Sequence, residues 1–215
     1  VFDAVPSQLD KVNKRFRMDA LKSGAVYDRY ANDFAWLIDA AVVLPTYQVS
    51  EPKRQLRRTA QENKFKLYEA DTGLLLSQYA PQTMLDVIAD APSVNFGSVY
   101  ENAVAQALSN ENPDLFYFCS SRKGEVDFIA QRNDGALVPI EVKSGKDYKL
   151  HTALNNLLGT HDFEIGEACV LSSANVERRE REGKPIWYLP LYMAFCIAEQ
   201  TSGTFGSMHL APPTF

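Results

Sequence analysis

The chain has 215 residues, of which 46% are hydrophobic and 23% charged, and this composition is typical of a globular protein with one large domain or two small ones. No apolar run approaches the ~18–20 residues that a membrane helix needs, and the first residues lack the pattern of a secretory signal. The three cysteines are widely spaced, which favours reduced thiols over a disulfide framework or a zinc site. We therefore expect a cytoplasmic protein without a membrane span.

The net charge of −5 is unevenly distributed along the chain. Residues 1–80 contain 12 Lys and Arg against 10 Asp and Glu, whereas residues 81–215 contain 10 against 17. Domains that bind nucleic acid through electrostatics alone are usually basic. The acidic second part therefore argues against broad DNA binding, but it is compatible with a phosphate site that a metal ion bridges.

Residues 1–80 are predicted to form helices followed by a two-strand ribbon. Apolar residues recur at three- and four-residue steps from Tyr27 to Ala40, which indicates an amphipathic helix. Residues 42–49 and 64–68 are predicted to be two paired strands, and this order is typical of a winged-helix unit. The loop between the strands carries three arginines that are either solvated or weak contacts to nucleic-acid phosphates: Arg54, Arg57 and Arg58.

Residues 81–95, which contain Pro81 and Pro92, are predicted to connect this unit to a second one. Residues 98–109 are then predicted to form an amphipathic helix. Glu101 lies at the border of its apolar stripe, where a glutamate either reaches inward or keeps its charged end in solvent. A strand at residues 115–120 follows.

Residues 124–146 carry the most plausible chemistry in the sequence. An Asp-Gly pair at residues 134–135 separates two apolar runs, which is a strong hairpin signal. With the turn there, Asp127 and Glu141 lie opposite each other, and Lys143 shares their face because side chains on a strand alternate. Such a patch is either a solvated ion pair or a cation site, since opposed carboxylates repel unless a cation lies between them. Flanking residues that are apolar on both faces favour the second interpretation, with a hard divalent cation.

The remaining elements complete an α-β-β-β-α-β order. We expect a helix at residues 149–158, a strand at 168–172, a charged loop at 175–184, a strand at 186–189 and a closing helix at 190–199, with no structure assigned after 201. Ser144-Gly145-Lys146 does not complete a phosphate-binding loop, so an ATP site would lie only in an upstream module, of which this chain would be a continuation. Lys146 and Lys149 are weak candidates for phosphate contacts.

Asp127 followed by Glu141-Val142-Lys143 resembles the D…(D/E)-x-K signature of the PD-(D/E)XK nuclease superfamily. The longer sequence pattern EVDFI…PIEVKSGK resembles the uncharacterised domain that follows the ATPase module in many bacterial and archaeal AAA-type ATPases. This resemblance extends to residues 65–75, 95–108 and 190–194, and so covers most of the chain.

The resemblance implies an α/β (α+β) protein with a winged-helix-like unit at residues 1–80, a connection at 81–95, a restriction-endonuclease-like αβββαβ domain at 96–200 and a tail at 201–215. It also implies Mg²⁺ (or Mn²⁺) held by Asp127, Glu141 and the carbonyl of Val142. Lys143 would position a water or offset charge on the phosphate, and Glu101 would support the metal.

Two functions stay open. One is a Mg²⁺-dependent nuclease. The other is a non-catalytic module that recognises DNA or protein on behalf of an attached ATPase.

Overall fold

The computed structural model describes residues 1–89, 91, 96–110, 112 and 114–199. The predicted tail at residues 201–215, together with residues 90 and 92–95 of the predicted connection, lies outside this range. Helices and two mixed sheets make up the described chain, so the mixed α/β class expected from the sequence is confirmed.

The first part of the chain has the predicted helix and ribbon. α2 (Tyr27–Asp39) buries Phe34 and Leu37 against the core, and an antiparallel pair of strands follows it. The elements in order are η1 (Phe2–Ala4), α1 (Val5–Leu9), η2 (Met18–Ala20), α2, β1 (Val43–Val49), η3 (Leu56–Thr59) and β2 (Ala60–Glu69).

Three helices follow: α3 (Thr72–Ser77), α4 (Pro81–Ile88) and α5 (Gly97–Ser109). The Asp71 side chain caps α3 by accepting a hydrogen bond of 3.0 Å from the Leu74 amide. α4 lies within the predicted connection, and its proline occupies the first helical turn, where proline is compatible with a helix.

The second part of the chain carries most of the strands. Its elements are β3 (Leu115–Ser120), β4 (Gly124–Val126), β5 (Phe128–Gln131), β6 (Leu137–Val142), α6 (Thr152–Leu158), β7 (Ala168–Ser172), β8 (Glu177–Arg181), β9 (Lys184–Pro190), η4 (Leu191–Phe195) and α7 (Cys196–Glu199). The expected loop at residues 175–184 is wrong, because β8 pairs with β9 as an exposed edge strand. An edge strand tolerates charged side chains, and this hides it from a hydrophobic pattern. The closing helix begins as a 3₁₀ helix.

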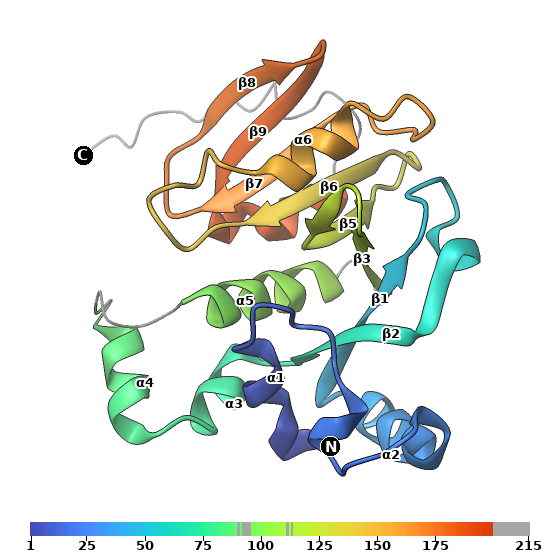
Figure 1. Cartoon of the computed structure of the whole chain (residues 1–215). Helices are drawn as coiled ribbons and strands as arrows, with labels where there is room; N and C mark the ends of the chain where they lie inside the picture. The colour runs from blue at the N-terminus through green and yellow to red at the C-terminus, as the bar shows by residue number, and fades with distance from the viewer. Residues whose placement is uncertain (90, 92–95, 111, 113, 200–215) are drawn as a thin grey trace.

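The strands form two sheets (Figure 1), with the orders β2-β1-β3-β4 and β5-β6-β7-β9-β8. β1 pairs with β3 in parallel, so the ribbon predicted as a separate wing shares a sheet with the second part of the chain. One hydrophobic core also contains residues from both parts, from Val5 to Ile197. The boundary between residues 80 and 96 therefore stays a prediction.

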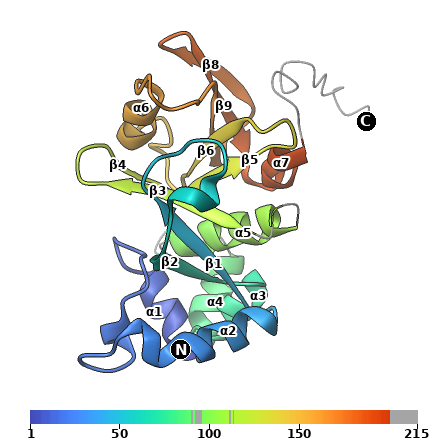
Figure 2. The same cartoon turned by 90° about the vertical axis from the view of Figure 1, so that its right-hand side faces the viewer.

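α5 lies between the first part of the chain and the second sheet, as both views show (Figures 1 and 2). Alternate residues of β6, such as Val138 and Ile140, pack into the core that contains α5, whereas Leu137 packs with α6 on the other face. The second sheet is thus covered on both faces, which explains its continuous apolar runs.

Candidate functional site

The predicted hairpin is confirmed. β5 and β6 are antiparallel, with Phe128 opposite Ile140, and Gly135 adopts a φ of +82° in the turn. Continuing this register places Asp127 opposite Glu141. Asp127 itself occupies the single residue between β4 and β5, where the chain passes from the first sheet to the second.

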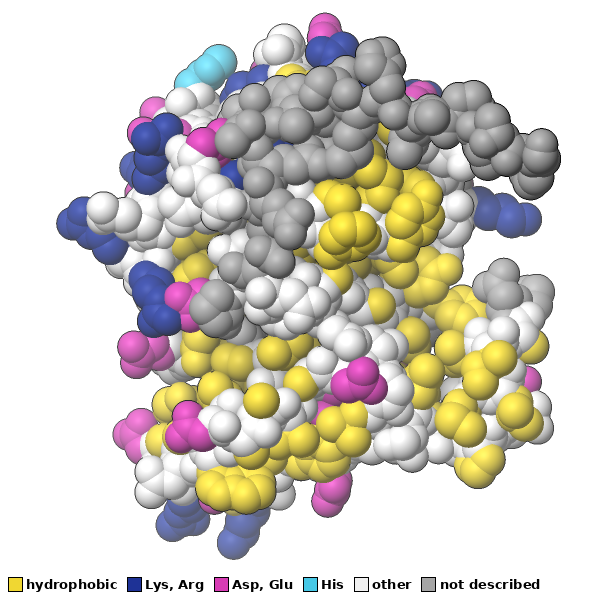
Figure 3. Space-filling view, turned by 180° about the vertical axis from the view of Figure 1, so that it is seen from behind, with side chains coloured by type: hydrophobic (Ala, Val, Ile, Leu, Met, Phe, Trp, Pro, Cys, Tyr) yellow, Lys and Arg dark blue, Asp and Glu magenta, His cyan; other side chains and the backbone are white. Residues whose placement is uncertain are grey.

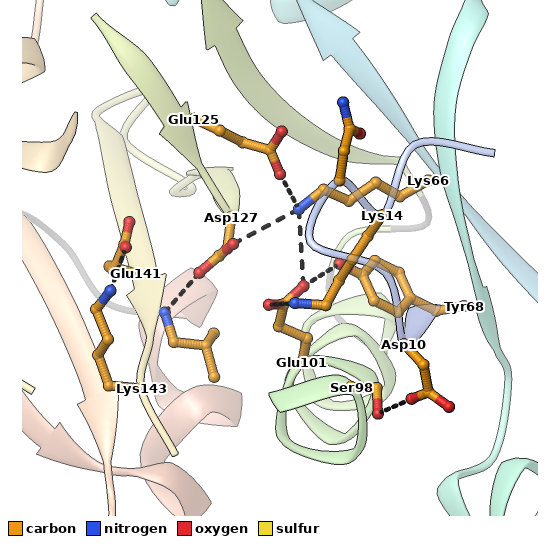
Figure 4. Close-up of polar contacts among 12 residues, drawn as sticks. Asp10, Lys14, Lys66, Tyr68, Ser98, Glu101, Glu125, Asp127, Glu141 and Lys143 are labelled. Atoms are coloured by element: carbon orange, nitrogen blue, oxygen red, sulfur yellow. Dashed lines mark hydrogen bonds and ion pairs between the residues drawn. The ribbon is translucent and has the colours of Figure 1, made fainter. Parts of the chain in front are cut away.

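The hairpin brings the three predicted residues into one region, but each already has a partner (Figure 4). Asp127 Oδ2 accepts a hydrogen bond of 2.9 Å from the amide of Val142. Glu141 Oε1 lies 2.8 Å from Lys143 Nζ, whereas Glu141 Oε2 is buried without a hydrogen-bond partner. Val142 thus contacts Asp127 through its N–H group.

Glu101 points into the molecule from α5 and is 4% exposed. Its partners come from the first part of the chain. Lys14 Nζ donates to Oε1 at 2.6 Å, and the Tyr68 hydroxyl donates to Oε2 at 2.8 Å. Of the two positions considered for this glutamate, the structure therefore has the inward one.

A lysine that sequence reasoning missed lies at the centre of these acids. Lys66, on β2, is fully buried, and its ammonium nitrogen lies 2.7 Å from Glu125 Oε1, 3.5 Å from Asp127 Oδ1 and 3.7 Å from Glu101 Oε2. It also lies 5.1 Å from the centre of the Tyr117 ring. Figure 4 shows the carboxylates of the three acids turned toward this nitrogen. We call Lys66 with these three acids the Lys66 cluster.

The sequence contains only a weak signal for the Lys66 cluster. Lys66 interrupts an otherwise apolar strand segment, Phe65 to Tyr68, and a charge in such a position needs a partner. Glu125 lies two residues before Asp127, so the strand period places both on one face. Nothing local shows that these segments, about 60 residues apart, meet in space.

The ion pairs between Lys66 and its neighbours favour the charged forms of both Glu101 and Lys66. Burial alone would raise the pKa of Glu101, but Lys66 and Lys14 outweigh it and hold that pKa below its ordinary value. Burial alone would lower the pKa of Lys66, yet Tyr68 and the surrounding carboxylates hold it well above the ordinary value. This direction favours the charged form of Lys66.

The opposite holds for the two hairpin carboxylates. Burial, together with the charges of Glu101 and Glu141, raises the pKa of Asp127 to about 8. Burial also raises the pKa of Glu141, although Lys143 counteracts it. Both acids therefore hold a proton more readily than an ordinary carboxyl group does.

The residues as arranged do not fit a resident Mg²⁺ ion. Mg²⁺ requires an octahedron of oxygen ligands, usually including several waters, whereas the space among Glu101, Glu125 and Asp127 is filled by the Lys66 ammonium group. Among the residues that the structure describes, no group of three or more His, Cys, Asp and Glu side chains is placed to hold a metal ion. The metal-binding and catalytic roles of the hairpin residues and Glu101 stay predictions.

The five candidate contacts to nucleic acid do not form one surface. Arg57 pairs with Asp114, and Arg54 lies 3.3 Å from Glu164. Lys149 lies 2.8 Å from Glu177, which leaves two cations for which the structure gives no ion pair, Arg58 and Lys146. Figure 1 shows the β1–β2 loop and the segment between β6 and α6 on opposite sides of the molecule.

One comparison with known proteins gives a match. Residues 96–192 match the family described as "Domain of unknown function (DUF4143)". Domains of this family commonly follow an AAA ATPase module. Neither the curated proteins nor the solved structures contain a match. The DUF4143 region, residues 96–192, includes Glu101, Asp127 and Glu141, whereas Lys14 and Lys66 lie before it.

Within the described part of the chain, no helix combines the length and the hydropathy that crossing a membrane requires.

Proposed function

We propose that the chain is a recognition module that works beside an AAA-type ATPase module and does not cut nucleic acid. The observation that carries this proposal is the position of Lys66. A buried ammonium group lies within 3.7 Å of Glu101, Glu125 and Asp127, and so faces two of the three acids that a nuclease of the PD-(D/E)XK type would use at its metal, Glu101 and Asp127.

A protein is the partner that the surface favours. Three of the five candidate basic side chains pair with carboxylates, and the net charge is negative. On the face seen from behind, hydrophobic side chains gather in patches, and Lys and Arg lie mainly at its edges (Figure 3). Large hydrophobic side chains are exposed at Trp36, Ile88 and Tyr192. Exposed aromatic and aliphatic groups of this kind are typical of protein interfaces, not of nucleic-acid grooves.

The context of the DUF4143 region supports the ATPase part of the proposal, because this family commonly follows such a module. ATP would bind in that module, since this chain lacks a phosphate-binding loop. We further propose a cytoplasmic location, because the three widely spaced cysteines do not have the pattern of a disulfide framework.

The second candidate function is a Mg²⁺-dependent nuclease. It is favoured by one specific observation, the buried Glu141 Oε2 without a hydrogen-bond partner, because a buried carboxylate oxygen without a donor is costly. This atom lies in the segment that carries the D…(D/E)-x-K pattern.

Cleavage assays separate the two candidates. Plasmid DNA, single- and double-stranded oligonucleotides and RNA would be incubated with the protein and Mg²⁺ or Mn²⁺. We expect the wild type to cut no more than the Asp127→Ala and Lys143→Ala variants. Metal-dependent cutting by the wild type that both variants lose would overturn the recognition role in favour of the nuclease.

Fluorescence anisotropy with labelled DNA tests the choice of partner. We expect no binding tighter than the non-specific range of about 10⁻⁴–10⁻⁶ M at physiological salt. A dissociation constant well below that range, weakened by Arg58→Ala or Lys146→Ala, would instead support recognition of nucleic acid.

A further inference from the structure

We propose that the ammonium group of Lys66 is a built-in counterion for Glu101, Glu125 and Asp127, in the place that a divalent cation would take, so that the site works without a metal ion. This inference deepens the proposed function, because it names what neutralises the acidic site. The two can nevertheless fail separately in the experiments below.

The burial of Lys66 is the first argument. A fully buried ammonium group has lost its hydration, and only close carboxylates can compensate for that loss. The three acids lie at 2.7, 3.5 and 3.7 Å from its nitrogen and come from different places in the fold: β4, the β4–β5 junction and α5. A convergence of this kind resembles the way in which carboxylates surround a metal ion.

The balance of charge is the second argument. Lys14 and Lys66 place two ammonium groups against Glu101, Glu125 and Asp127, and the raised pKa of Asp127 lets this third acid hold a proton, so the cluster is close to neutral. A divalent ion added to this arrangement would leave an excess of positive charge while it competes with Lys66 for the same space. The site is thus closed to Mg²⁺ by both charge and volume.

The origin of the charges is the third argument. Both cations come from residues 1–80, and all three acids lie in the DUF4143 region. The counterion is therefore supplied by one part of the chain to the other, and it ties β2 to α5 and β4.

The wild type provides a test that needs no variant. Thermal unfolding would be recorded with about 10 mM MgCl₂ or MnCl₂ and, as a control, with NaCl at matched ionic strength. Mn²⁺ binding would be measured separately by electron paramagnetic resonance. We expect no metal-specific shift in Tm and no saturable Mn²⁺ binding. Saturable binding of one Mn²⁺ per chain that Asp127→Asn abolishes would overturn the inference.

Lys66→Ala provides the complementary test, because it removes the charge and leaves room for a hydrated ion. We expect this variant to melt below the wild type and to gain saturable Mn²⁺ binding, with a Tm rise of about 3–6 °C at ten times the dissociation constant. Lys64→Ala is the matched control, since Lys64 lies two residues earlier on the same strand and makes no contact with the cluster, and it should gain nothing. A folded Lys66→Ala that binds no Mn²⁺ would contradict the inference.

A rescue experiment covers the case in which Lys66→Ala does not fold. Lys66→Met keeps most of the volume, and combining it with Glu125→Gln removes one of the unpaired acids. If Lys66 is a counterion, the double variant melts higher than Lys66→Met alone, because an uncompensated charge has been removed. A double variant that melts no higher would overturn the inference.

These outcomes also separate the counterion inference from the proposed recognition role. If the wild type binds Mn²⁺ but cuts no nucleic acid, the recognition role stands and the counterion inference is wrong. If the wild type cuts nucleic acid without any divalent ion, the counterion inference stands and the recognition role is wrong.

Discussion

Two buried carboxylates where β2 meets α5, those of Glu101 and Glu69, have different partners. Glu101 is surrounded by Lys14, Lys66 and Tyr68. Glu69, fully buried at the end of β2, has only the side-chain amide of Gln78, which donates to Oε1 at 2.8 Å, and its Oε2 has no hydrogen-bond partner.

The pKa values of the two acids diverge accordingly. Burial raises the pKa of Glu69 to about 7, whereas Lys66 and Lys14 outweigh burial at Glu101 and lower its pKa. A buried carboxylate can thus be neutralised either by a cation or by a proton, and this molecule uses both within a few residues. The cation fixes a permanent charge pair, whereas the proton leaves a group that responds to pH.

Removing the cation gives the largest expected effect. Lys66→Met should lower the free energy of unfolding by about 3–5 kcal/mol, because breaking a buried ion pair leaves uncompensated charges. Urea denaturation followed by circular dichroism measures this loss. Lys64→Met, at a position outside the cluster, should change the stability by no more than about 0.5 kcal/mol. Equal losses of unfolding free energy in Lys66→Met and Lys64→Met would show that Lys66 is not what separates Glu101 from Glu69.

The proton at Glu69 gives the next largest effect. Because the pKa of about 7 in the folded state exceeds the ordinary value of 4.5, the folded state binds more protons between these pH values, and stability falls as pH rises through this window. Glu69→Gln should abolish about 2 kcal/mol of this fall between pH 5 and pH 8, measured as the difference between the wild-type and variant urea curves. Parallel curves would show that Glu69 has an ordinary pKa.

The hydroxyl of Tyr68 tests how much of the Glu101 environment depends on a neutral donor. Tyr68→Phe should cost about 1.5 kcal/mol, since hydrogen bonds to charged groups are worth more than neutral ones. A double-mutant cycle with Glu101→Gln isolates the pairwise contribution. A coupling energy near zero would mean that the two lysines alone stabilise this carboxylate.

An exposed ion pair gives the smallest effect. Arg57→Ala, which breaks the pair with Asp114, should cost about 0–1 kcal/mol because solvent screens this interaction. The same urea measurements provide the check. A loss comparable to that of Lys66→Met would show that burial does not separate strong pairs from weak ones here.

The elements that the sequence predicts well are those with a local signal. Each of these signals lies within one short stretch of sequence: the apolar periodicity of α2, the Asp-Gly turn, and the apolar runs of β3 and β7. The structure has these elements within about a residue of the predicted positions. β8 is missed because an edge strand with charged side chains lacks a hydrophobic pattern, and α4 was not predicted as a helix within the connection at residues 81–95.

The candidate site was predictable only in part. The hairpin register follows from its turn, and the inward position of Glu101 was one of two open alternatives. The partnership with Lys66 could not be predicted, because it depends on the parallel pairing of β1 with β3 and not on any local pattern. Long-range pairing of this kind decides whether carboxylates enclose a metal ion or a side chain.

The position of β1 between β2 and β3 has a consequence for any attempt to isolate residues 96–192. Without residues 1–80, β3 would become a bare edge that can associate with other chains, and Glu101, Glu125 and Asp127 would lose their lysines. We therefore expect residues 96–192 not to fold stably on their own, and a stable fragment to include β1 and β2.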